Sequence, residues 1–217
     1  MDKREQSQRF NNDVSEIMPK IKILLQNDEF LVIDKPYDVR IDGDTSKGHT
    51  GCYCLALTKK SAGIASVAFA KRKVDKYYLA IVRGWLKNDS YVVEQPIAEV
   101  PNNRYRMSIG TDGNPGKSAK TEIKVLLTLV SLHPITGRRH QLRLHCQFLN
   151  HPIVGDWHYE RQIMNYTDTW RMMLHAQKLV IPLYKNDEEK GRILDVDAGD
   201  PFSELVVEDL RNNVVEN

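Results

Sequence analysis

Long apolar runs are missing from this sequence, and their absence excludes several kinds of protein. No stretch of roughly 18 consecutive apolar residues occurs, so we expect no membrane-spanning helix. Residues 1–20 mix acidic and basic side chains without an apolar segment, which is not the pattern of a secretory signal or an acid-poor transit peptide. These features favour a cytoplasmic or nuclear protein without membrane contact.

Cysteine is scarce as well. The chain has three cysteines, and Cys52 and Cys54 fall on the same face of a predicted strand. An odd number and this placement argue against a disulfide framework. We therefore expect a reducing compartment.

Net charge is small, only +2, but it is spread unevenly. Residues 185–217 carry ten acidic and four basic side chains, whereas residues 1–184 carry 27 basic and 19 acidic ones. A modestly positive body suits a protein that meets phosphate, although many other proteins share it. With 217 residues, 41% of them apolar, we expect one domain at 21–184, flanked by a polar extension at 1–20 and an acidic, frayed tail at 185–217.

Strand and helix signals along the chain predict an α+β fold, a mixed and mostly antiparallel sheet with helices packed on it. The clearest helix covers residues 61–72, with Ile64, Val67 and Ala68 as its buried stripe. Alternation along a strand at 74–82 places Lys76 and Tyr78 on one face. Further strands are expected at residues 22–25, 30–34, 52–57 and 174–182.

The most informative stretch covers residues 134–156 and indicates a turn that leads into a basic helix. Thr136 is the expected N-cap, and Asn150 is expected to end the helix in a left-handed conformation. Arg139 and Arg143 then share one stripe of the helix, which can face a polyanion or a partner carboxylate. A solvated arginine-rich helix is the alternative explanation.

Three phrases in this region, TGRRHQLRLHC at 136–146, HPIVGD at 151–156 and RMMLHA at 171–176, resemble the C-terminal motifs of the RluA-type pseudouridine synthases. Other segments resemble the same family in the same order, so the similarity spans residues 22–184. These segments are FLVIDKP at 30–36, VDKYYLAIVRG at 74–84, QPI at 95–97, Met107, and KSAKT at 117–121. The resemblance implies the pseudouridine synthase fold and the isomerisation of a flipped uridine in structured RNA, without cofactor or metal.

The resemblance also implies roles for individual residues. Arg143 matches the arginine that orients a catalytic carboxylate, and Tyr78 matches the tyrosine that stacks on the base and helps to remove its C5 proton. Lys35 and Leu144 match lesser substrate-binding positions, with a turn cap and simple packing as their structural alternatives. The remaining expected RNA contacts, mainly to phosphate, are Lys76, Arg138, Arg139 and His140.

The chain departs from the family at the catalytic aspartate. Counting back from Gly51 puts Ser46 where the aspartate is expected, while Asp44 and Asp42 are close but out of register. The segment at 122–133 also looks too short for the family's strand, turn and strand. Two hypotheses follow: an active synthase that uses Asp44 or Asp42, or an RNA-binding homologue, splice form or incomplete form without the nucleophile.

Two further motifs carry less weight. The chain's histidines do not follow a zinc-binding spacing, so we expect no metal site. Gly113 to Ser118 ends like a phosphate-binding loop, but only two residues separate its glycines where four are required. The sequence from Asp112 to Asn114 predicts a turn instead. The histidines in question are His140, His145, His151, His158 and His175.

Overall fold

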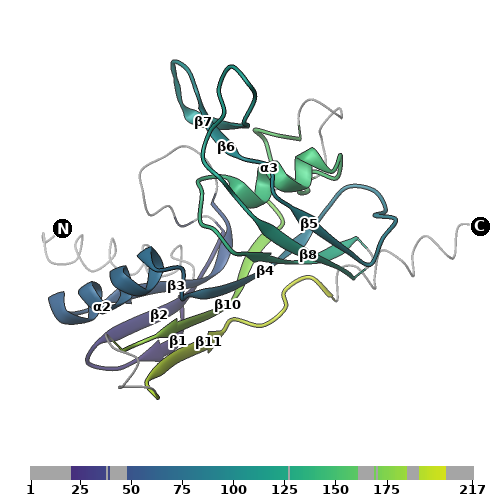
Figure 1. Cartoon of the computed structure of the whole chain (residues 1–217). Helices are drawn as coiled ribbons and strands as arrows, with labels where there is room; N and C mark the ends of the chain where they lie inside the picture. Colours follow the sequence, from purple (N-terminus) through teal and green to yellow (C-terminus); the bar gives the residue numbers. More distant parts are fainter. Residues whose placement is uncertain are drawn as a thin grey trace, which may run out of the picture.

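The computed structural model describes residues 21–37, 39, 48–126, 128–160, 169, 171–184 and 191–203. In this part of the chain, nine strands form one mixed sheet and two strands form a separate ribbon. Along the main sheet the order is β1-β2-β3-β10-β4-β9-β8-β5, with β11 paired to β10 off this path. Among the described strands only β3 and β10 pair in parallel, so the expected α+β fold with a mostly antiparallel sheet is confirmed (Figure 1).

The first three strands form an antiparallel meander. They are β1 (Lys22–Gln26), β2 (Phe30–Lys35) and β3 (Thr50–Ala56). The side chain of Asn27 makes the first turn, since its Oδ1 accepts hydrogen bonds from the backbone N–H groups of Glu29 and Phe30 at 2.9 and 2.8 Å. Local polar chemistry therefore fixes this hairpin where the sequence predicts it.

Helix α2 (Lys59–Ala70) covers one end of the sheet (Figure 1). A capping box starts it, in which the Thr58 hydroxyl accepts from the Ser61 N–H and the Ser61 hydroxyl accepts from the Thr58 N–H. Ile64 and Ala68 are buried as expected, but Val67 is 42% exposed. The prediction for Val67 is wrong because the buried stripe runs through Ser61, Ile64 and Ala68.

A second group of strands carries the centre of the sheet. Strand β4 (Asp75–Ile81) pairs with β9 (Leu129–Pro134), which continues to β8 (Thr121–Leu126) and β5 (Ser90–Val93). The hairpin of β8 and β9 pairs regularly from Thr121 with Pro134 to Leu126 with Leu129. The expectation that residues 122–133 are too few for strand, turn and strand is therefore wrong, because a tight turn joins two complete strands.

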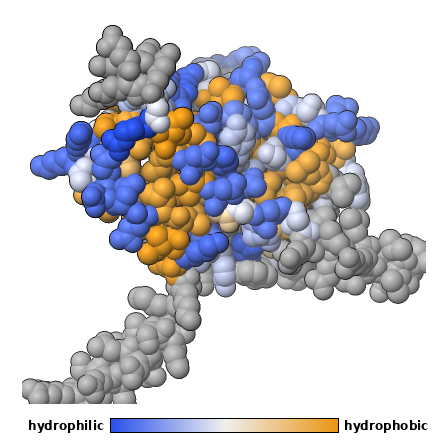
Figure 2. Space-filling view, turned by 90° about the horizontal axis from the view of Figure 1, so that it is seen from below, coloured by the Kyte–Doolittle hydropathy of each residue, from blue (hydrophilic) through white to orange (hydrophobic). Residues whose placement is uncertain are grey.

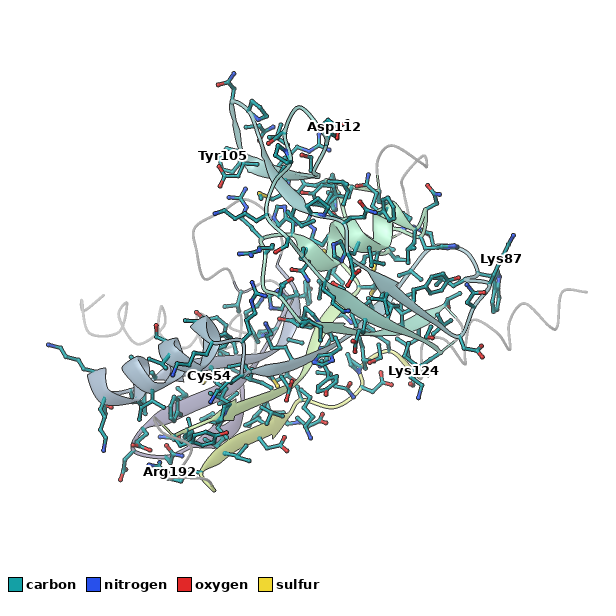
Figure 3. All side chains as sticks on the ribbon, viewed as in Figure 1. Cys54, Lys87, Tyr105, Asp112, Lys124 and Arg192 are labelled. Carbon is teal, nitrogen blue, oxygen red and sulfur yellow. The ribbon has the colours of Figure 1, made fainter. Side chains whose placement is uncertain are left out.

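The separate ribbon consists of β6 (Ile97–Val100) and β7 (Asn103–Ile109) and projects from the body of the molecule (Figure 1). Figure 3 labels Tyr105 and Asp112 at this projecting end. Thr111 and Asn114 form an isolated bridge, which confirms the predicted turn around Asp112. The ribbon thus stands beside helix α3 (Gln141–Phe148), with which it shares a small core.

The sheet extends past the expected end of the domain. Strand β10 (Leu174–Pro182) pairs with β11 (Ile193–Asp197), and Leu194 and Val196 of β11 are buried. Phe202 is fully buried as well. The domain boundary expected at residue 184 is therefore too early, since the described residues 191–203 complete the core.

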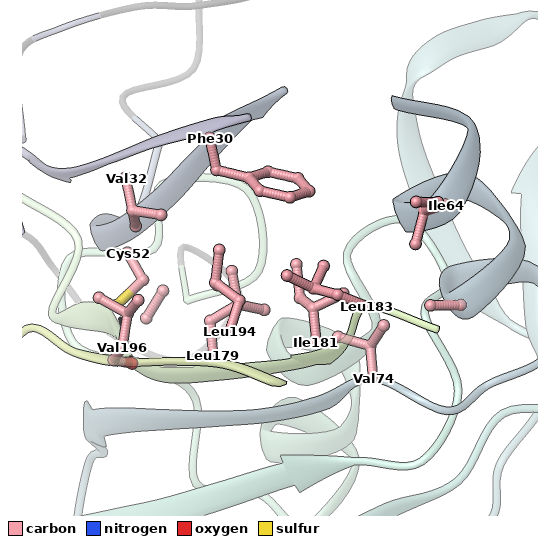
Figure 4. Close-up of a cluster of buried hydrophobic side chains, with 12 residues drawn as sticks. Phe30, Val32, Cys52, Ile64, Val74, Leu179, Ile181, Leu183, Leu194 and Val196 are labelled. Carbon is pink, nitrogen blue, oxygen red and sulfur yellow. Dashed lines mark hydrogen bonds between the residues drawn. The ribbon is translucent and has the colours of Figure 1, made fainter. Parts of the chain in front are cut away.

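The largest core cluster joins the N-terminal and C-terminal strands under α2. Figure 4 shows Phe30, Cys52 and Ile64 turned toward the same interior as Leu194 and Val196. A second cluster packs α3 and β9 against β4, and Tyr78 contacts both clusters. Because Tyr78 contacts both clusters, packing restricts the orientation of its ring.

Apolar side chains are not confined to the interior. On the face seen in Figure 2 they gather in patches between hydrophilic side chains. Within the described part of the chain, no helix is long and apolar enough to cross a membrane.

Candidate active site

Helix α3 begins later than the sequence predicts. His140 is its N-cap residue, in a left-handed conformation with φ 57°, and no side chain caps the helix there. Thr136 makes other contacts, because its Oγ1 accepts from the Lys120 N–H at 2.9 Å and donates to Gln141 Oε1 at 2.7 Å. The predicted N-cap role of Thr136 is therefore wrong, since its hydroxyl ties the loop to the residue before β8.

The end of α3 follows the prediction. Asn150 is left-handed with φ 63°, and the His151 N–H donates to the Cys146 carbonyl at 3.0 Å. This hydrogen bond spans six residues, as in a Schellman ending. Both ends of α3 are therefore defined, and the loop from 135 to 140 joins β9 to this helix.

A pocket of about 370 Å³ lies where this loop meets β4 and the start of β10. Two distant parts of the chain supply the predicted residues that line it, and Gly48 and His49 line it too. The predicted site residues at this pocket are Lys76, Tyr78, Arg138, Arg139, His140 and Arg143. The sequence thus predicted a set of side chains that the fold brings together, and their individual roles stay predictions.

Two predicted substrate-binding residues lie elsewhere. Leu144 is 2% exposed and packs with Ile97, Ala119 and Tyr159, on the side of α3 that faces the ribbon. The assignment of Leu144 to substrate binding is corrected to core packing. Lys35 is also buried, and its Nζ donates to the carbonyl groups of Pro36 and Val39 at 2.9 and 3.0 Å, so it caps the turn after β2.

Arg143 already has a carboxylate partner. Its Nε and Nη2 donate to the two oxygens of Asp156 at 2.7 and 2.6 Å, in the bidentate geometry that suits a guanidinium. Asp156 is 1% exposed and does not line the pocket, and its Oδ1 also accepts from the His158 N–H at 3.1 Å. Asp156 is thus a partner carboxylate of Arg143 of the kind that the sequence allowed, but it is buried outside the pocket lining, and the predicted catalytic carboxylate stays a prediction.

Tyr159 holds Arg143 on its other side. The guanidinium carbon lies 4.8 Å from the centre of the Tyr159 ring, within the range of a cation–π contact. The Tyr159 hydroxyl accepts from the Met107 N–H at 3.0 Å and lies 2.7 Å from His140 Nδ1. Through Tyr159, the ribbon, the loop and the arginine are connected.

Asp156 and Tyr159 belong to the site although the sequence did not predict them. Asp156 closes the HPIVGD motif, and its position after a glycine and before two aromatic residues carries no sign of a partner 13 residues earlier. Gly155 explains part of the motif, because its φ is +77° and a Cβ there would lie 2.0 Å from the Arg171 carbonyl oxygen. Only glycine fits at position 155, directly before the buried Asp156.

Burial shifts the pKa of two pocket residues. The pKa of His140 is lowered to about 3, first by burial and then by the charges of Arg143 and Arg139, so the imidazole is neutral near pH 7. The pKa of Tyr78 is raised to about 12, mainly by burial. His49 meets the Tyr78 ring edge-on at 5.7 Å between centroids. The pocket therefore presents a neutral imidazole and a protonated phenol beside its cations.

Among the described residues, no aspartate or glutamate lines this pocket. Asp42, Asp44 and Ser46 lie outside the described residues, so the predicted role of Asp44 is untested. The described histidines, cysteines and carboxylates form no group of three or more that could hold a metal ion.

Comparisons with known proteins show the family of this chain. The sequence profile described as RNA pseudouridylate synthase matches residues 39–148. The RNA pseudouridylate synthase domain-containing protein 1 of Danio rerio is 32% identical over 231 residues, which cover 85% of this chain and 76% of the relative. The ribosomal large subunit pseudouridine synthase D of Borreliella burgdorferi is 35% identical over 156 residues, covering 70% of this chain and 46% of that protein.

A solved structure is similar over nearly the whole fold. Human RNA Pseudouridylate Synthase Domain Containing 1 superposes with a TM-score of 0.72 at 29% identity, covering 90% of this chain and 98% of that one. The chain belongs to the RNA pseudouridylate synthase family, within the RluA type that its motifs resemble.

Proposed function

We propose that this chain isomerises uridine to pseudouridine in RNA, with the uridine flipped out of its loop and bound beside Tyr78. The observation that carries the proposal is the meeting of Tyr78 and Arg143 in one pocket with further basic side chains. Membership of the family supports the same reaction. The N1–C1′ bond is broken and C5 is joined to C1′, while the C5 proton is released and N1 gains one.

The basic side chains of the pocket bind the RNA backbone in this proposal. Lys76, Arg138 and Arg139 supply positive charge beside the base site, and such contacts add affinity without reading sequence. His140 contributes no charge, because its pKa of about 3 keeps it neutral. We therefore expect salt to weaken RNA binding through these cations and not through His140.

Tyr78 binds the uracil ring by stacking in this proposal. A pKa of about 12 leaves roughly one phenol in 10⁵ ionised at pH 7, so the resting hydroxyl is a poor base. The two cores that contact Tyr78 keep the ring in one orientation. This favours its use as a rigid platform for the flipped base.

Arg143 can serve a second carboxylate. A guanidinium has five N–H donors, and Asp156 occupies one on Nε and one on Nη2. Three donors are left on a side chain that lines the pocket. We propose that they receive the catalytic carboxylate and keep it ionised for attack or proton removal at the sugar.

Asp44 is the first candidate for that carboxylate, and Asp42 the second. Gly48 lines the pocket, and an extended chain reaches about 3.5 Å per residue, so the Cα of Asp44 lies within about 14 Å of that of Gly48. The sequence therefore keeps Asp44 within range of the pocket edge. If neither aspartate acts, the chain binds RNA without catalysis.

Release of tritium from C5-labelled uridine tests the proposal. Total cellular RNA labelled in this way is incubated with the wild-type chain and with the variants Asp44→Ala, Asp42→Ala and Arg143→Ala. Wild-type release that falls by several orders of magnitude in Arg143→Ala and in one aspartate variant supports the proposal. Asp112→Ala is the control, since Asp112 is exposed on the projecting turn. RNA binding by the wild type without tritium release would refute catalysis.

A further inference from the structure

A second pocket lies between α2 and the sheet, and nothing in the proposed chemistry uses it. It has a volume of about 440 Å³ and is lined mainly by apolar side chains. Its helix wall is the stripe of Ala62, Ala65 and Phe69, whose spacing places all three on one face of α2. Figure 3 shows Cys54, part of its floor, beside α2. We call this pocket the α2 groove.

The α2 groove is continuous with the catalytic pocket. His49, Lys76 and Tyr78 line both, so the ring that would carry the flipped uracil forms part of each wall. If an RNA strand places its target base in the catalytic pocket, one of the two neighbouring nucleotides can lie past Tyr78, toward the α2 groove. The groove is thus positioned to meet the nucleotide next to the target.

Two cysteines in the groove wall are uncharged, and Lys178, which also lines the groove, is paired with Asp195 at 3.1 Å. Burial raises the pKa of Cys52 to about 11 and raises the pKa of Cys54 too, so both thiols are protonated near pH 7. Small side chains on the helix leave space above them, as Ala62 and Ala65 carry only a methyl group. A flat, weakly polar group such as a nucleobase suits the apolar part of these walls.

At the edge of the groove, Lys76 can bind a phosphate and Phe69 can stack on a base. Lys76 lies at the boundary of the two pockets, with its Nζ 5.9 Å from the centre of the Phe69 ring. Phe69 is 46% exposed, so its ring is accessible for stacking. One phosphate links two adjacent nucleotides, and Lys76, which lines both pockets, matches the position of that phosphate.

We propose that the α2 groove binds the unpaired base of the nucleotide next to the target uridine, with the intervening phosphate at Lys76. This inference rests on the proposed function, since it assumes that the uridine occupies the catalytic pocket. The groove then selects RNA in which the neighbour of the target is free to leave its stack.

The test uses synthetic pentaribonucleotides with a central uridine, either unmodified or with an abasic residue on the 5′ or the 3′ side of it. Binding is measured by fluorescence anisotropy with the wild type, Ala65→Trp, Phe69→Ala and the control Val67→Ala. Val67 is on the same helix and 42% exposed, but does not line the groove. Ala65→Trp fills the groove, and Phe69→Ala, at an exposed position, keeps the test valid if the larger residue disturbs folding.

We expect one abasic substitution to weaken wild-type binding roughly tenfold, the loss of one stacked base. Ala65→Trp and Phe69→Ala should weaken binding of the unmodified pentamer to a similar extent. These two variants should then bind the unmodified and the abasic pentamer equally well. Val67→Ala should bind both pentamers as the wild type does. Equal binding of all pentamers by the wild type would overturn the groove but leave the proposed function intact, provided that Arg138→Ala still weakens binding. No binding of any pentamer would also overturn the groove, while tritium release from cellular RNA decides the proposed function separately.

Discussion

Removal of the Asp156 carboxylate is the sharpest test of how the site is built. In Asp156→Ala the guanidinium of Arg143, which is 8% exposed, loses the partner that accepts from both its Nε and Nη2. The His158 N–H loses its acceptor as well. A buried cation is then left without compensation, which is costlier than losing the pair as a whole.

The size of the effect follows from burial. Removing one partner of a buried ion pair costs about 3–5 kcal/mol, and a domain of this size is stable by only about 5–15 kcal/mol. We therefore expect the free energy of unfolding to fall by about a fifth or more. The contact of Arg143 with the Tyr159 ring at 4.8 Å should keep the side chain in place only partly.

Urea unfolding followed by circular dichroism measures this change. Asp195→Ala is the matched control, because Asp195 pairs with Lys178 at 3.1 Å at the surface, with their side chains 53% and 36% exposed, and should cost about 1 kcal/mol or less. The double variant Arg143→Met with Asp156→Ala should recover about 2 kcal/mol or more relative to the sum of the single changes. A loss below about 1 kcal/mol for Asp156→Ala, or additive single changes, would refute the reasoning.

Two further predictions concern pH and the backbone. His140 has a pKa of about 3 in the folded chain against an ordinary 6.5, so the unfolded chain binds more protons below pH 6.5 and stability is lost as pH falls from 6.5 toward 3. Asparagine tolerates the same left-handed conformation, so His140→Asn should reduce the dependence of stability on pH. The reduction is at most about 1.4 kcal/mol per pH unit, and less for a partly exposed ring. An unchanged pH dependence in thermal unfolding from pH 7 to 5 would contradict this. Gly155→Ala should prevent stable folding or lower the free energy of unfolding by several kcal/mol, because its Cβ would meet the Arg171 carbonyl. Gly63→Ala, with nothing within 4 Å, should instead raise the free energy of unfolding by about 0.5–1 kcal/mol. Equal melting temperatures of the two variants would contradict the backbone argument.

The parts of the fold that could be predicted from the sequence depend on local chemistry. Alternation placed Lys76 and Tyr78 on one face of β4, and both do line one pocket. The left-handed Asn150 follows from its own side chain and the proline that comes two residues later. These features need no knowledge of distant contacts.

The features that were missed depend on distant contacts. Threonine is a common N-cap residue, yet the Thr136 hydroxyl accepts a hydrogen bond from the N–H of Lys120, 16 residues earlier. Asp156 belongs to the site only because a glycine turn brings it to Arg143. Strand β11 lies in an acidic segment whose charge outweighs its two buried apolar residues, so composition alone suggested a tail.

The place of β10 in the sheet has a consequence for synthesis of the chain. This strand, at residues 174–182, lies between β3, which ends at residue 56, and β4, which ends at residue 81. Until it leaves the ribosome, the facing edges of β3 and β4 have no neighbour to receive their backbone hydrogen bonds. The catalytic pocket, which borders β4 and the start of β10, therefore forms late during translation, and nascent chains stopped before residue 174 expose two open sheet edges to chaperones or to one another.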